Sequence, residues 1–315
     1  MSASIGVAVS SPDLVGASDL LRAADVALYR AKAAEKGDVA VFDANRDESA
    51  LLRLDRETEL RRALERGELW VAYQPILQLA TGAVVGVEAL VRWQHPERGV
   101  VGPDQFIPLA EETGLILPLG RWLRWQACHQ VRAWQERFDG QACLQLSVNL
   151  SPREFQQPDL VADLTGILEE TGLSPSCLTL EVTESAAIAT DPELSVSALS
   201  VLRKLGLRLA LDDFGTGYAS LSAIKRFPVD DLKIDHSFVA GLGRSHEDTA
   251  IVRATIGVAR ALGLRVTAEG VETAEQIAQL RDLDCDCVQG YFVAPPLTAE
   301  ALEAFVQARQ GLGNG

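Results

Sequence analysis

The residues best placed to do chemistry are two adjacent carboxylates, Asp212 and Asp213, which directly follow the apolar run Leu209–Leu211. A buried parallel strand is a short apolar run bounded by turn signals, and acids add nothing to its packing. A glycine-rich turn begins at Gly215, so the acids stand where the backbone needs unusual angles. The pair therefore predicts a metal site at a strand tip. One acid could instead cap a helix beginning near Tyr218, but that explanation suits a single acid better than a pair.

Further polar side chains recur within or at the end of other apolar runs. In chain order they are Glu88, Asn149, Glu181, Lys233 with Asp235, Glu269 and Gln289. At any single position a cap or a buried ion pair explains such a residue about as well as a function does. Barrel enzymes, however, build their sites at the carboxyl ends of their strands, so the repeated placement predicts one shared site.

The candidate ligands offer oxygen atoms, and hard oxygen ligands select Mg²⁺ or Mn²⁺ over zinc. The histidines are scattered and are expected to lie outside the strand ends, at His95, His129, His236 and His246. Because clustered carboxylates repel one another without cations, we expect two ions with one aspartate between them. Lys233 has three interpretations: a structural counter-charge, a group that orients a metal-bound water or, least favoured beside so many acids, a Schiff-base amine.

Composition narrows the class of partner. Lys and Arg number 29 against 44 Asp and Glu in 315 residues, and this net charge of -15 disfavours nucleic acid polymers and anionic membranes. No apolar run reaches the ~18 residues of a membrane span, and the N-terminus lacks the blocks of a signal peptide. We therefore expect a cytoplasmic chain without membrane contact of its own, although a longer parent protein could carry sensor or membrane segments. Five cysteines without zinc-like spacing predict reduced, buried thiols.

The elements that position these residues form a regular pattern beyond Gly67, where strand-length apolar runs alternate with amphipathic stretches, as in a mostly parallel α/β domain. The predicted strands are Trp70–Leu77, Val84–Val91, Leu144–Leu150, Leu178–Val182, Arg208–Leu211, Asp231–Ile234, Arg265–Ala268 and Cys287–Phe292. The predicted helices are Leu119–Phe138, Asp159–Glu170, Glu193–Leu205, Thr249–Leu262 and Ala274–Leu283. Residues 78–83 alone separate the first two strands, too few for a helical crossover, so these pair as an antiparallel hairpin. The fold class is α/β, a modified TIM (β/α)8-type barrel with one antiparallel strand.

Two segments precede the barrel. A short strand at Ile5–Val9 and a helix from Ser18 to Gly37 form a small strand-helix piece, and a charged helix follows over Asp47–Arg66. Roughly 40 residues bury too little surface to be stable alone. We therefore expect this remnant to pack on the connecting helix or on a neighbouring chain, or to be mobile.

Seven ordered motifs span the predicted barrel. They are Glu88-Ala89-Leu90-Val91-Arg92-Trp93, Asn149-Leu150-Ser151, Leu180-Glu181-Val182-Thr183-Glu184, Asp212-Asp213-Phe214-Gly215-Thr216-Gly217, Leu232-Lys233-Ile234-Asp235, Ala268-Glu269-Gly270-Val271-Glu272-Thr273 and Gln289-Gly290-Tyr291. Together they resemble the EAL family of cyclic di-GMP phosphodiesterases, over about Arg56–Val306. The resemblance implies hydrolysis of one phosphodiester bond of cyclic di-GMP to linear pGpG, with Mg²⁺ or Mn²⁺.

The resemblance also implies a role for each matching residue. One ion would be held by Glu88, Asn149, Glu181 and Asp212, and the second would be held or approached by Asp212, Asp213 and Glu269. Lys233 would position the water, Glu184 would hold the loop after Asp213, and Glu269 would be the general base unless the two ions activate the water themselves. The nucleotide would be contacted or its site supported by Gln74, Leu90, Arg92, Asp235 and Gln289.

The first segment resembles the C-terminal end of a GGDEF, or diguanylate cyclase, domain, on Ser4-Ile5-Gly6-Val7-Ala8 and Ala24–Lys32. The signature loop of the cyclase is absent from the sequence, so no cyclase activity is predicted. The predicted domains are residues 1–45 as a GGDEF-like fragment, 46–66 as a connecting helix, 67–310 as the EAL barrel and 311–315 as a tail.

The resemblance thus implies an active phosphodiesterase that forms a homodimer through the barrel. We expect Ca²⁺ to inhibit it, because Ca²⁺ is larger and activates water less well than Mg²⁺. The alternative is a catalytically silent receptor for cyclic di-GMP on the same fold, and a generic Mg²⁺-dependent barrel lyase ranks third. Degenerate receptors are expected to lose ligands, and every matching metal and lysine position is intact here.

Overall fold

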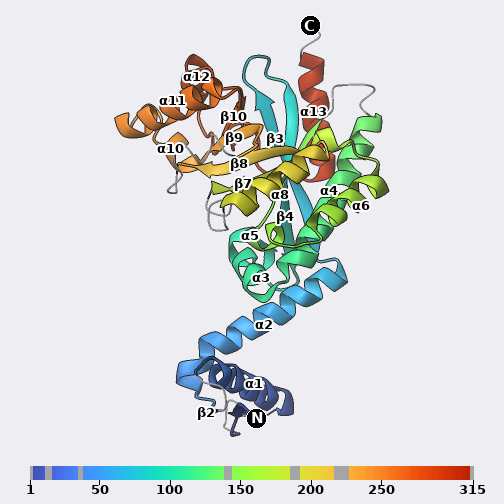
Figure 1. The fold of residues 1–315 in the computed structure, drawn as a ribbon, viewed down its shortest axis with the longest axis vertical. Helices are drawn as coiled ribbons and strands as arrows, with labels where there is room; N and C mark the ends of the chain where they lie inside the picture. Colours follow the sequence, from blue (N-terminus) through green and yellow to red (C-terminus); the bar gives the residue numbers. More distant parts are fainter. Residues whose placement is uncertain are drawn as a thin grey trace.

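A long helix, α2 (Ala44–Arg66), joins a barrel to a small N-terminal unit in the computed structural model (Figure 1). The structure describes residues 3–10, 16–34, 38–137, 144–184, 192–215 and 227–312. The connecting helix was expected from its charged, helix-favouring sequence. Its C-terminal half packs on the barrel, where Leu60 and Ala63 are fully buried. Leu60, Ala63 and Leu64 are spaced so that they share one face of the helix.

The N-terminal unit consists of β1 (Ile5–Val7), α1 (Ala17–Ala34) and β2 (Val39–Val41). The two strands pair in parallel, and α1 packs so closely on Gly6 that a Cβ there would meet the carbonyl oxygen of Ala24 at 2.1 Å. The sequence predicted the first strand and the helix but not β2. An ion pair of 2.7 Å between Arg22 and Asp55 ties α1 to α2, which is one of the arrangements expected for this piece.

Eight strands close the barrel in the order β3-β11-β10-β9-β8-β7-β6-β4, with β4 paired back to β3. They are β3 (Leu69–Gln78), β4 (Val84–His95), β6 (Gln145–Asn149), β7 (Leu178–Thr183), β8 (Arg208–Phe214), β9 (Asp231–Ile234), β10 (Arg265–Ala268) and β11 (Cys287–Val288). β3 runs antiparallel to both neighbours, and the other ring pairings are parallel. A short strand, β5 (Gly99–Val101), lies outside the ring and pairs antiparallel with the last residues of β4. The predicted fold class is confirmed.

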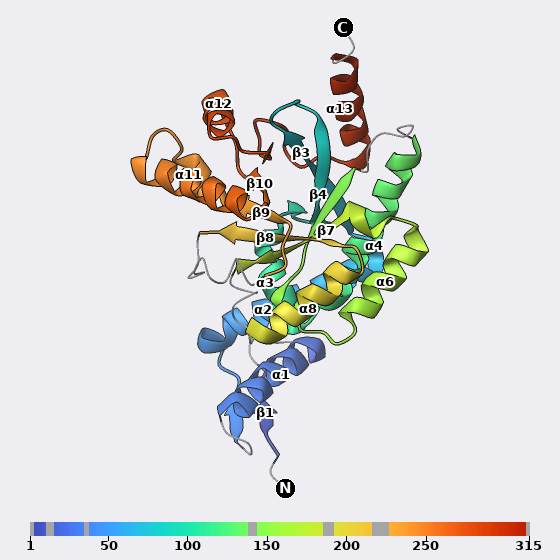
Figure 2. The ribbon, with the colours of Figure 1, turned by 45° about the horizontal axis from the view of Figure 1, so that its top comes forward.

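Helices surround the ring, with α4 and α6 on the side opposite to α11 and α12 (Figure 2). They are η1 (Pro103–Gln105), α3 (Ile107–Thr113), α4 (Ile116–Arg137), α5 (Pro152–Phe155), α6 (Leu160–Thr171), η2 (Pro175–Cys177), α8 (Pro192–Lys204), α10 (His236–Ala240), α11 (His246–Ala261), α12 (Ala274–Asp282) and α13 (Ala299–Leu312). Each predicted barrel helix is present, and its observed ends differ by no more than a turn. None of the described helices has both the length and the apolarity needed to cross a membrane.

Alternation along the strands separates the hydrophobic core from the barrel interior. On β7, Leu178, Leu180 and Val182 pack in the core between ring and helices, whereas Thr179 and Glu181 face the inside. Because side chains at i and i+2 share one face of a strand, every polar inward residue brings its i+2 neighbour to the same interior. The fold therefore gathers polar residues from separate strands inside one ring.

Two expectations about local structure are wrong. The last strand ends at Val288 rather than at Phe292, because the chain turns where the Val293 amide donates to the Gly290 carbonyl at 3.0 Å. Cys177 is disulfide-bonded, whereas Cys128, Cys285 and Cys287 are free and buried as expected. An odd number of cysteines excludes only the pairing of all five, and sequence spacing does not show which thiols meet.

Candidate functional site

The ring register places the predicted site residues in one layer, which lies toward the carboxyl ends of the parallel strands β6 to β10 and, for Glu88, within the longer β4. Asn149 on β6 pairs with Glu181 on β7, and Glu88 on β4 pairs with Ser147, two residues before Asn149. Five strands, β4 and β6 to β9, each contribute one residue to this layer, and the residue directly after β10 is the sixth. In chain order they are Glu88, Asn149, Glu181, Asp212, Lys233 and Glu269. The convergence predicted from strand ends is therefore present in the structure.

Lys233 lies at the centre of this layer, with its side chain 3% exposed. Its ammonium nitrogen is 2.6 Å from Glu181 Oε2 and 2.5 Å from Glu269 Oε1. Two further carboxylates are less close, Glu88 at 3.5 Å and Asp212 at 3.7 Å. The lysine thus contacts oxygen atoms that come from four different strands or strand ends.

The electrostatics of the cluster follow from burial and from the excess of carboxylates. Burial alone would lower the pKa of Lys233, but the four surrounding carboxylates raise it well above its ordinary value, so the ammonium stays charged. Burial raises the pKa of Glu269 to about 8, with Lys233 opposing that shift. Burial also raises the pKa of Glu181, and its carboxylate neighbours add to the effect. One lysine does not neutralise this many acids.

Glu88 is fixed from two sides by amide groups. Asn149 donates from Nδ2 to Glu88 Oε1 at 2.7 Å, and Gln289 donates from Nε2 to Glu88 Oε2 at 2.6 Å. The same Gln289 nitrogen donates to Gln74 Oε1 at 2.9 Å, and Gln74 in turn donates to the Ala294 carbonyl. Because the turn at Gly290 ends β11, Gln289 lies at the tip of the strand and can reach these partners.

Three carboxylates form a second group beside the lysine. One oxygen each from Asp212, Asp213 and Glu269 lies within 4.8 Å of the others. Asp213 has a φ of 54°, a left-handed conformation that is uncommon for residues with a Cβ, and its amide donates to Asp212 Oδ1 at 2.9 Å. An all-oxygen donor set with excess negative charge fits Mg²⁺ or Mn²⁺. The residues present therefore fit the predicted metal, with Asp212 common to both groups.

The cluster opens into a cavity of about 270 Å³ above the strand ends. The cavity is lined by Gln74, Glu88, Leu90, Asp212, His236, Glu269, Gly270, Glu272, Gln289, Gly290 and Tyr291. The histidines were expected to fall outside the strand ends. His236 does so, as the first residue of α10, although it lines this cavity. His95 is a correction, because it is the last residue of β4. The predicted strand ended at Val91, whereas β4 continues to His95, where it pairs with Gly99 of β5.

Two further predicted residues, Arg92 and Asp235, are not among the residues that line this cavity. Arg92 is half-buried and donates to the Val91 carbonyl, and burial lowers its pKa while Tyr291 and Glu88 oppose that effect. Asp235 caps α10 through the Ser237 amide at 3.0 Å and lies 2.9 Å from His236 Nδ1. The structure thus uses the Asp235 carboxylate within its own helix, and its contact with substrate stays a prediction.

Glu184 lies just beyond β7 and accepts a hydrogen bond of 3.1 Å from the Gly215 amide. This bond ties the first residues after Asp213 to the end of a neighbouring strand, as the predicted role of Glu184 requires. The helix expected near Tyr218 lies outside the described residues. The role of the glycine-rich turn beyond Gly215 is outside them as well.

Two features of the site were missed by sequence reasoning. Tyr291 lines the cavity and is 69% exposed, and it could have been found because it completes the Gln289-Gly290-Tyr291 motif. Ser151, two residues after Asn149, accepts from the Glu154 amide and caps α5. The serine, proline and glutamate at positions 151, 152 and 154 carry the pattern of a capping box, which would have predicted that helix.

Comparisons with known proteins agree with this geometry. The profile of the EAL domain family matches residues 57–296. The cyclic di-GMP phosphodiesterase PdeR of Escherichia coli is 39% identical over 302 residues, which cover 96% of this chain and 45% of PdeR. The bifunctional diguanylate cyclase/cyclic di-GMP phosphodiesterase MucR of Pseudomonas aeruginosa is 41% identical over 306 residues, which cover 97% of this chain and 44% of MucR.

A solved structure gives the same result for the fold. The MucR phosphodiesterase in complex with cyclic di-GMP is 43% identical and superimposes with a TM-score of 0.76, covering 79% of this chain and 99% of that one. The chain spans less than half the length of the curated relatives described above. Because the profile covers well over half of the chain and the relatives match nearly all of it, the chain belongs to the EAL domain family.

Proposed function

We propose that this chain is a metal-dependent phosphodiesterase that hydrolyses one phosphodiester bond of cyclic di-GMP to give linear pGpG. The observation that carries the proposal is the cluster of carboxylates around Lys233, of which Glu88, Asp212 and Glu269 line the 270 Å³ cavity. Relatives that are named cyclic di-GMP phosphodiesterases, and a related structure in complex with cyclic di-GMP, support the choice of substrate.

Two cations, Mg²⁺ or Mn²⁺, are proposed for this site. The ligands of one would be Glu88, Asn149, Glu181 and Asp212, and those of the other would be Asp212, Asp213 and Glu269. When bound, the cations would neutralise the carboxylates and lower the pKa of a water held at the site. The excess of acids over Lys233 supports two ions rather than one.

The chain's own groups would then position the reactants and move protons. Lys233 would orient the attacking water while it keeps Glu181 in place. Glu269, which contacts Lys233, would accept a proton from that water unless the two cations activate the water themselves. The water oxygen forms a bond to phosphorus and the bond from phosphorus to the 3′ oxygen breaks. The leaving oxygen takes a proton from solvent, so the product carries a 5′-phosphate and a free 3′-hydroxyl.

The nucleotide would be held by residues at the cavity wall. Gln74 and Leu90 line the cavity, and hydrogen bonds from Gln289 fix the side chains of Gln74 and Glu88. The Arg92 guanidinium matches the geometry of a phosphate. Asp235 is proposed to contact the nucleotide indirectly, through His236.

The test is a direct assay. Purified protein is incubated with cyclic di-GMP and Mg²⁺ or Mn²⁺, and the products are separated by chromatography. Accumulation of pGpG that depends on the metal is the expected result. Tight binding of cyclic di-GMP by calorimetry without any pGpG would instead support the silent receptor.

Several broader points stay predictions. They are the origin of residues 1–45 as a fragment of a GGDEF-like domain, the division at 46–66, 67–310 and 311–315, the homodimer through the barrel and the cytoplasmic location. The parallel β1–β2 pair with α1 packed on one face supports the idea that residues 1–45 belong to a larger sheet. Sedimentation analysis of the purified chain at several concentrations would test the dimer.

A further inference from the structure

A second layer of inward side chains lies directly beneath the candidate metal site. On each strand, the residue two positions before a site residue faces the same interior. These residues are Gly86, Ser147, Thr179, Ala210, Asp231 and Thr267. Most of them are small or carry a hydroxyl, so they fill less space than the bulky branched residues that usually fill a barrel of this kind.

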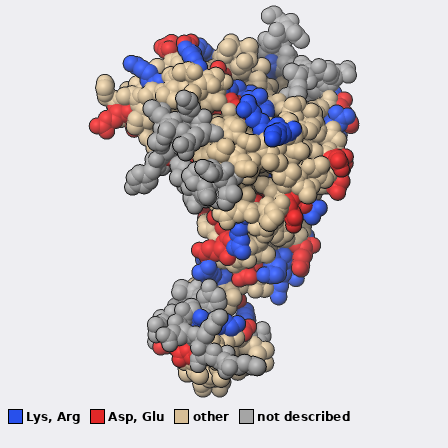
Figure 3. Space-filling view, viewed as in Figure 1, with Lys and Arg blue, Asp and Glu red and all other residues tan. Residues whose placement is uncertain are grey.

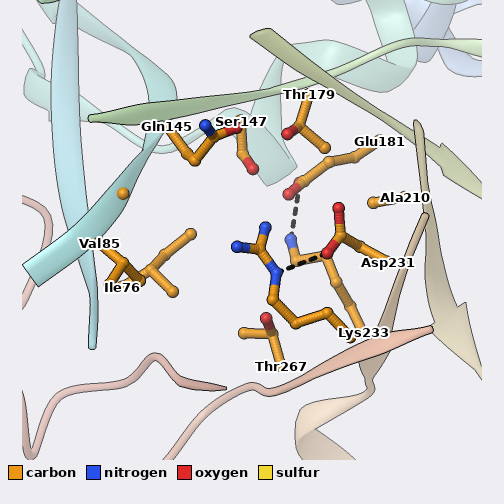
Figure 4. A pocket seen from close by; sticks show the side chains of 12 residues that line it. Ile76, Val85, Gln145, Ser147, Thr179, Glu181, Ala210, Asp231, Lys233 and Thr267 are labelled. Carbon is orange, nitrogen blue, oxygen red and sulfur yellow. Dashed lines mark hydrogen bonds and ion pairs between the residues drawn. The ribbon is translucent and has the colours of Figure 1, made fainter. Parts of the chain in front are cut away.

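The small side chains leave a cavity inside the ring (Figure 4). Its volume is about 20 Å³, and a single water needs roughly 10–15 Å³. Glu181 and Lys233 line it on the side of the metal site, and Asp231 lies on another side, where it binds Arg208 and Arg265. Charged and hydroxyl side chains therefore form part of the cavity wall, and the cavity is large enough for one water.

Thr179 is the residue of this layer that calls for such a water. It is 2% exposed, and its Oγ1 has no hydrogen-bond partner among the described residues. Buried hydroxyl groups in folded proteins are almost always hydrogen-bonded, to protein or to ordered water. Figure 4 shows Thr179 and Glu181 side by side on β7, both directed into the cavity.

The charges around the cavity decide what occupies it. Glu181 and Asp231 would repel an anion, and Lys233 and Arg265 would repel a cation. A neutral molecule that both donates and accepts hydrogen bonds satisfies the hydroxyl and the carboxylates together. Water has these properties and fits the volume.

We propose that one buried water occupies this cavity, bonded to the Thr179 hydroxyl and donating to the Glu181 carboxylate, and that Thr179 is a positioning residue for the metal site. Lys233 holds Glu181 on its upper side at 2.6 Å, and the water holds it from beneath. The carboxylate then has one orientation before any metal arrives. The consequence for metal binding rests on the proposed role of Glu181 as a ligand, whereas the presence of the water does not.

The first experiment measures Mn²⁺ binding by calorimetry on the metal-free full chain, without nucleotide. Thr179→Val keeps the shape of the side chain and removes its hydroxyl, so Mn²⁺ affinity should fall 10- to 100-fold, as for other groups that orient a metal ligand. Thr179→Ser restores the hydroxyl and should bind within a few-fold of the wild type. Thermal denaturation of both variants checks that they are folded.

The matched control is Thr171→Val on α6, which removes another buried hydroxyl. The Thr171 hydroxyl donates to the Ile167 carbonyl within its own helix, away from the barrel interior. This control should leave Mn²⁺ affinity unchanged. Equal binding by the Thr179→Val variant and the wild type would overturn the positioning role. Failure of the wild type itself to bind Mn²⁺ would instead contradict the proposed metal site.

The second experiment locates the water. A crystal structure of the wild-type chain at a resolution that resolves ordered waters should show one within hydrogen-bond distance of both Thr179 Oγ1 and a Glu181 carboxylate oxygen. The same analysis of the Thr179→Val variant should show it lost or displaced. A dry cavity in the wild type, or a Thr179 hydroxyl bonded to a protein atom, would overturn the proposal whatever the calorimetry shows.

Discussion

At the scale of single residues, Lys233 has the most demanding environment in the site. Within the described part of the chain, it is the cationic side chain that lies within 4 Å of Glu88, Glu181, Asp212 and Glu269. Loss of one partner from a buried ion pair leaves the other charge uncompensated, which costs more than the pair itself contributes. Lys233 therefore has a structural role in the metal-free protein in addition to any role in the reaction.

Lys233→Met tests both roles together. The methionine keeps an unbranched apolar stem, so the change removes the charge with little change in shape. We expect the metal-free variant to lose about 3–5 kcal/mol of stability in urea unfolding. Added Mn²⁺ should recover part of that loss, because the cations replace the missing positive charge, while pGpG formation stays near background. A variant as stable as the wild type without metal would contradict this account.

Asp212→Asn separates catalysis from binding. Asp212 belongs to both proposed ligand sets, and asparagine keeps its shape while it removes one charge. Turnover should fall by several orders of magnitude, because activation of the water depends on both cations. Binding of cyclic di-GMP, measured by calorimetry, should be retained, since Gln74 and Leu90 are unchanged and the repulsion of substrate phosphates is lower.

The matched control for that change is Asp163→Asn on α6, whose carboxylate lies 3.5 Å from Arg121 on the surface. It removes the same charge from the chain but not from the site, so turnover should be unchanged. An Asp212→Asn variant with near wild-type turnover would falsify the shared-ligand assignment.

At the scale of elements, a buried ion pair stabilises the junction between β6 and α5, which follows the proposed ligand Asn149. Arg124 on α4 donates to Glu154 Oε1 at 2.6 Å, and both side chains are almost fully buried. The other oxygen of Glu154 accepts from the amide and hydroxyl of Ser151. Since Ser151 comes two residues after Asn149, this network fixes the direction in which the chain leaves the ligand.

Arg124→Met should therefore be costly for stability. It leaves the Glu154 carboxylate buried without its partner, and we expect a loss of about 3–5 kcal/mol in urea unfolding. Arg132→Met is the matched control on the same helix. Its ion pair with Glu136 is largely exposed, so its loss should cost about 1 kcal/mol or less. Similar losses of unfolding free energy in the two variants would contradict the expectation that the buried pair contributes more to stability than the exposed pair.

At the scale of the whole molecule, charge is distributed unevenly between surface and site. Lys and Arg are interspersed with Asp and Glu over the connecting helix and the barrel surface beside it (Figure 3), where ion pairs join Arg61 to Glu57 and Arg98 to Glu59. Inside the ring the acids exceed the cations. Folding brings these carboxylates close together, where they repel one another. Binding of divalent metal should therefore stabilise the folded state, because the cations relieve that repulsion.

Thermal denaturation with and without metal measures this effect. Mn²⁺ at a hundred times its Kd stabilises the folded state by about 2.7 kcal/mol. For a domain of this size that should raise Tm by roughly 5–10 °C. Ca²⁺ should also raise Tm, because it binds the same carboxylates, but it should inhibit turnover since it activates water poorly. Full turnover in Ca²⁺ alone would contradict the proposed chemistry.

The sequence by itself determined the barrel and most of the ligand candidates, because both depend on local patterns. Strand-length apolar runs such as Arg208–Leu211 and Arg265–Ala268 became ring strands, and the acids that follow them came together at one end of the ring. Alternation and strand ends are properties of neighbouring residues. The carboxyl ends of parallel strands in a closed ring necessarily meet.

Only the tertiary structure decided the features that join residues far apart in the chain. β2 forms because it pairs with β1, although all of α1 separates the two strands in the sequence. The Arg124 side chain on α4 likewise donates to Glu154 on α5. The cavity beneath the site arises where small side chains from several strands face one another, around a Thr179 hydroxyl that has no hydrogen-bond partner in the described part of the chain. Sequence patterns report which face a side chain takes, but whether two faces meet, and how much space remains between them, depends on the packing of the complete ring.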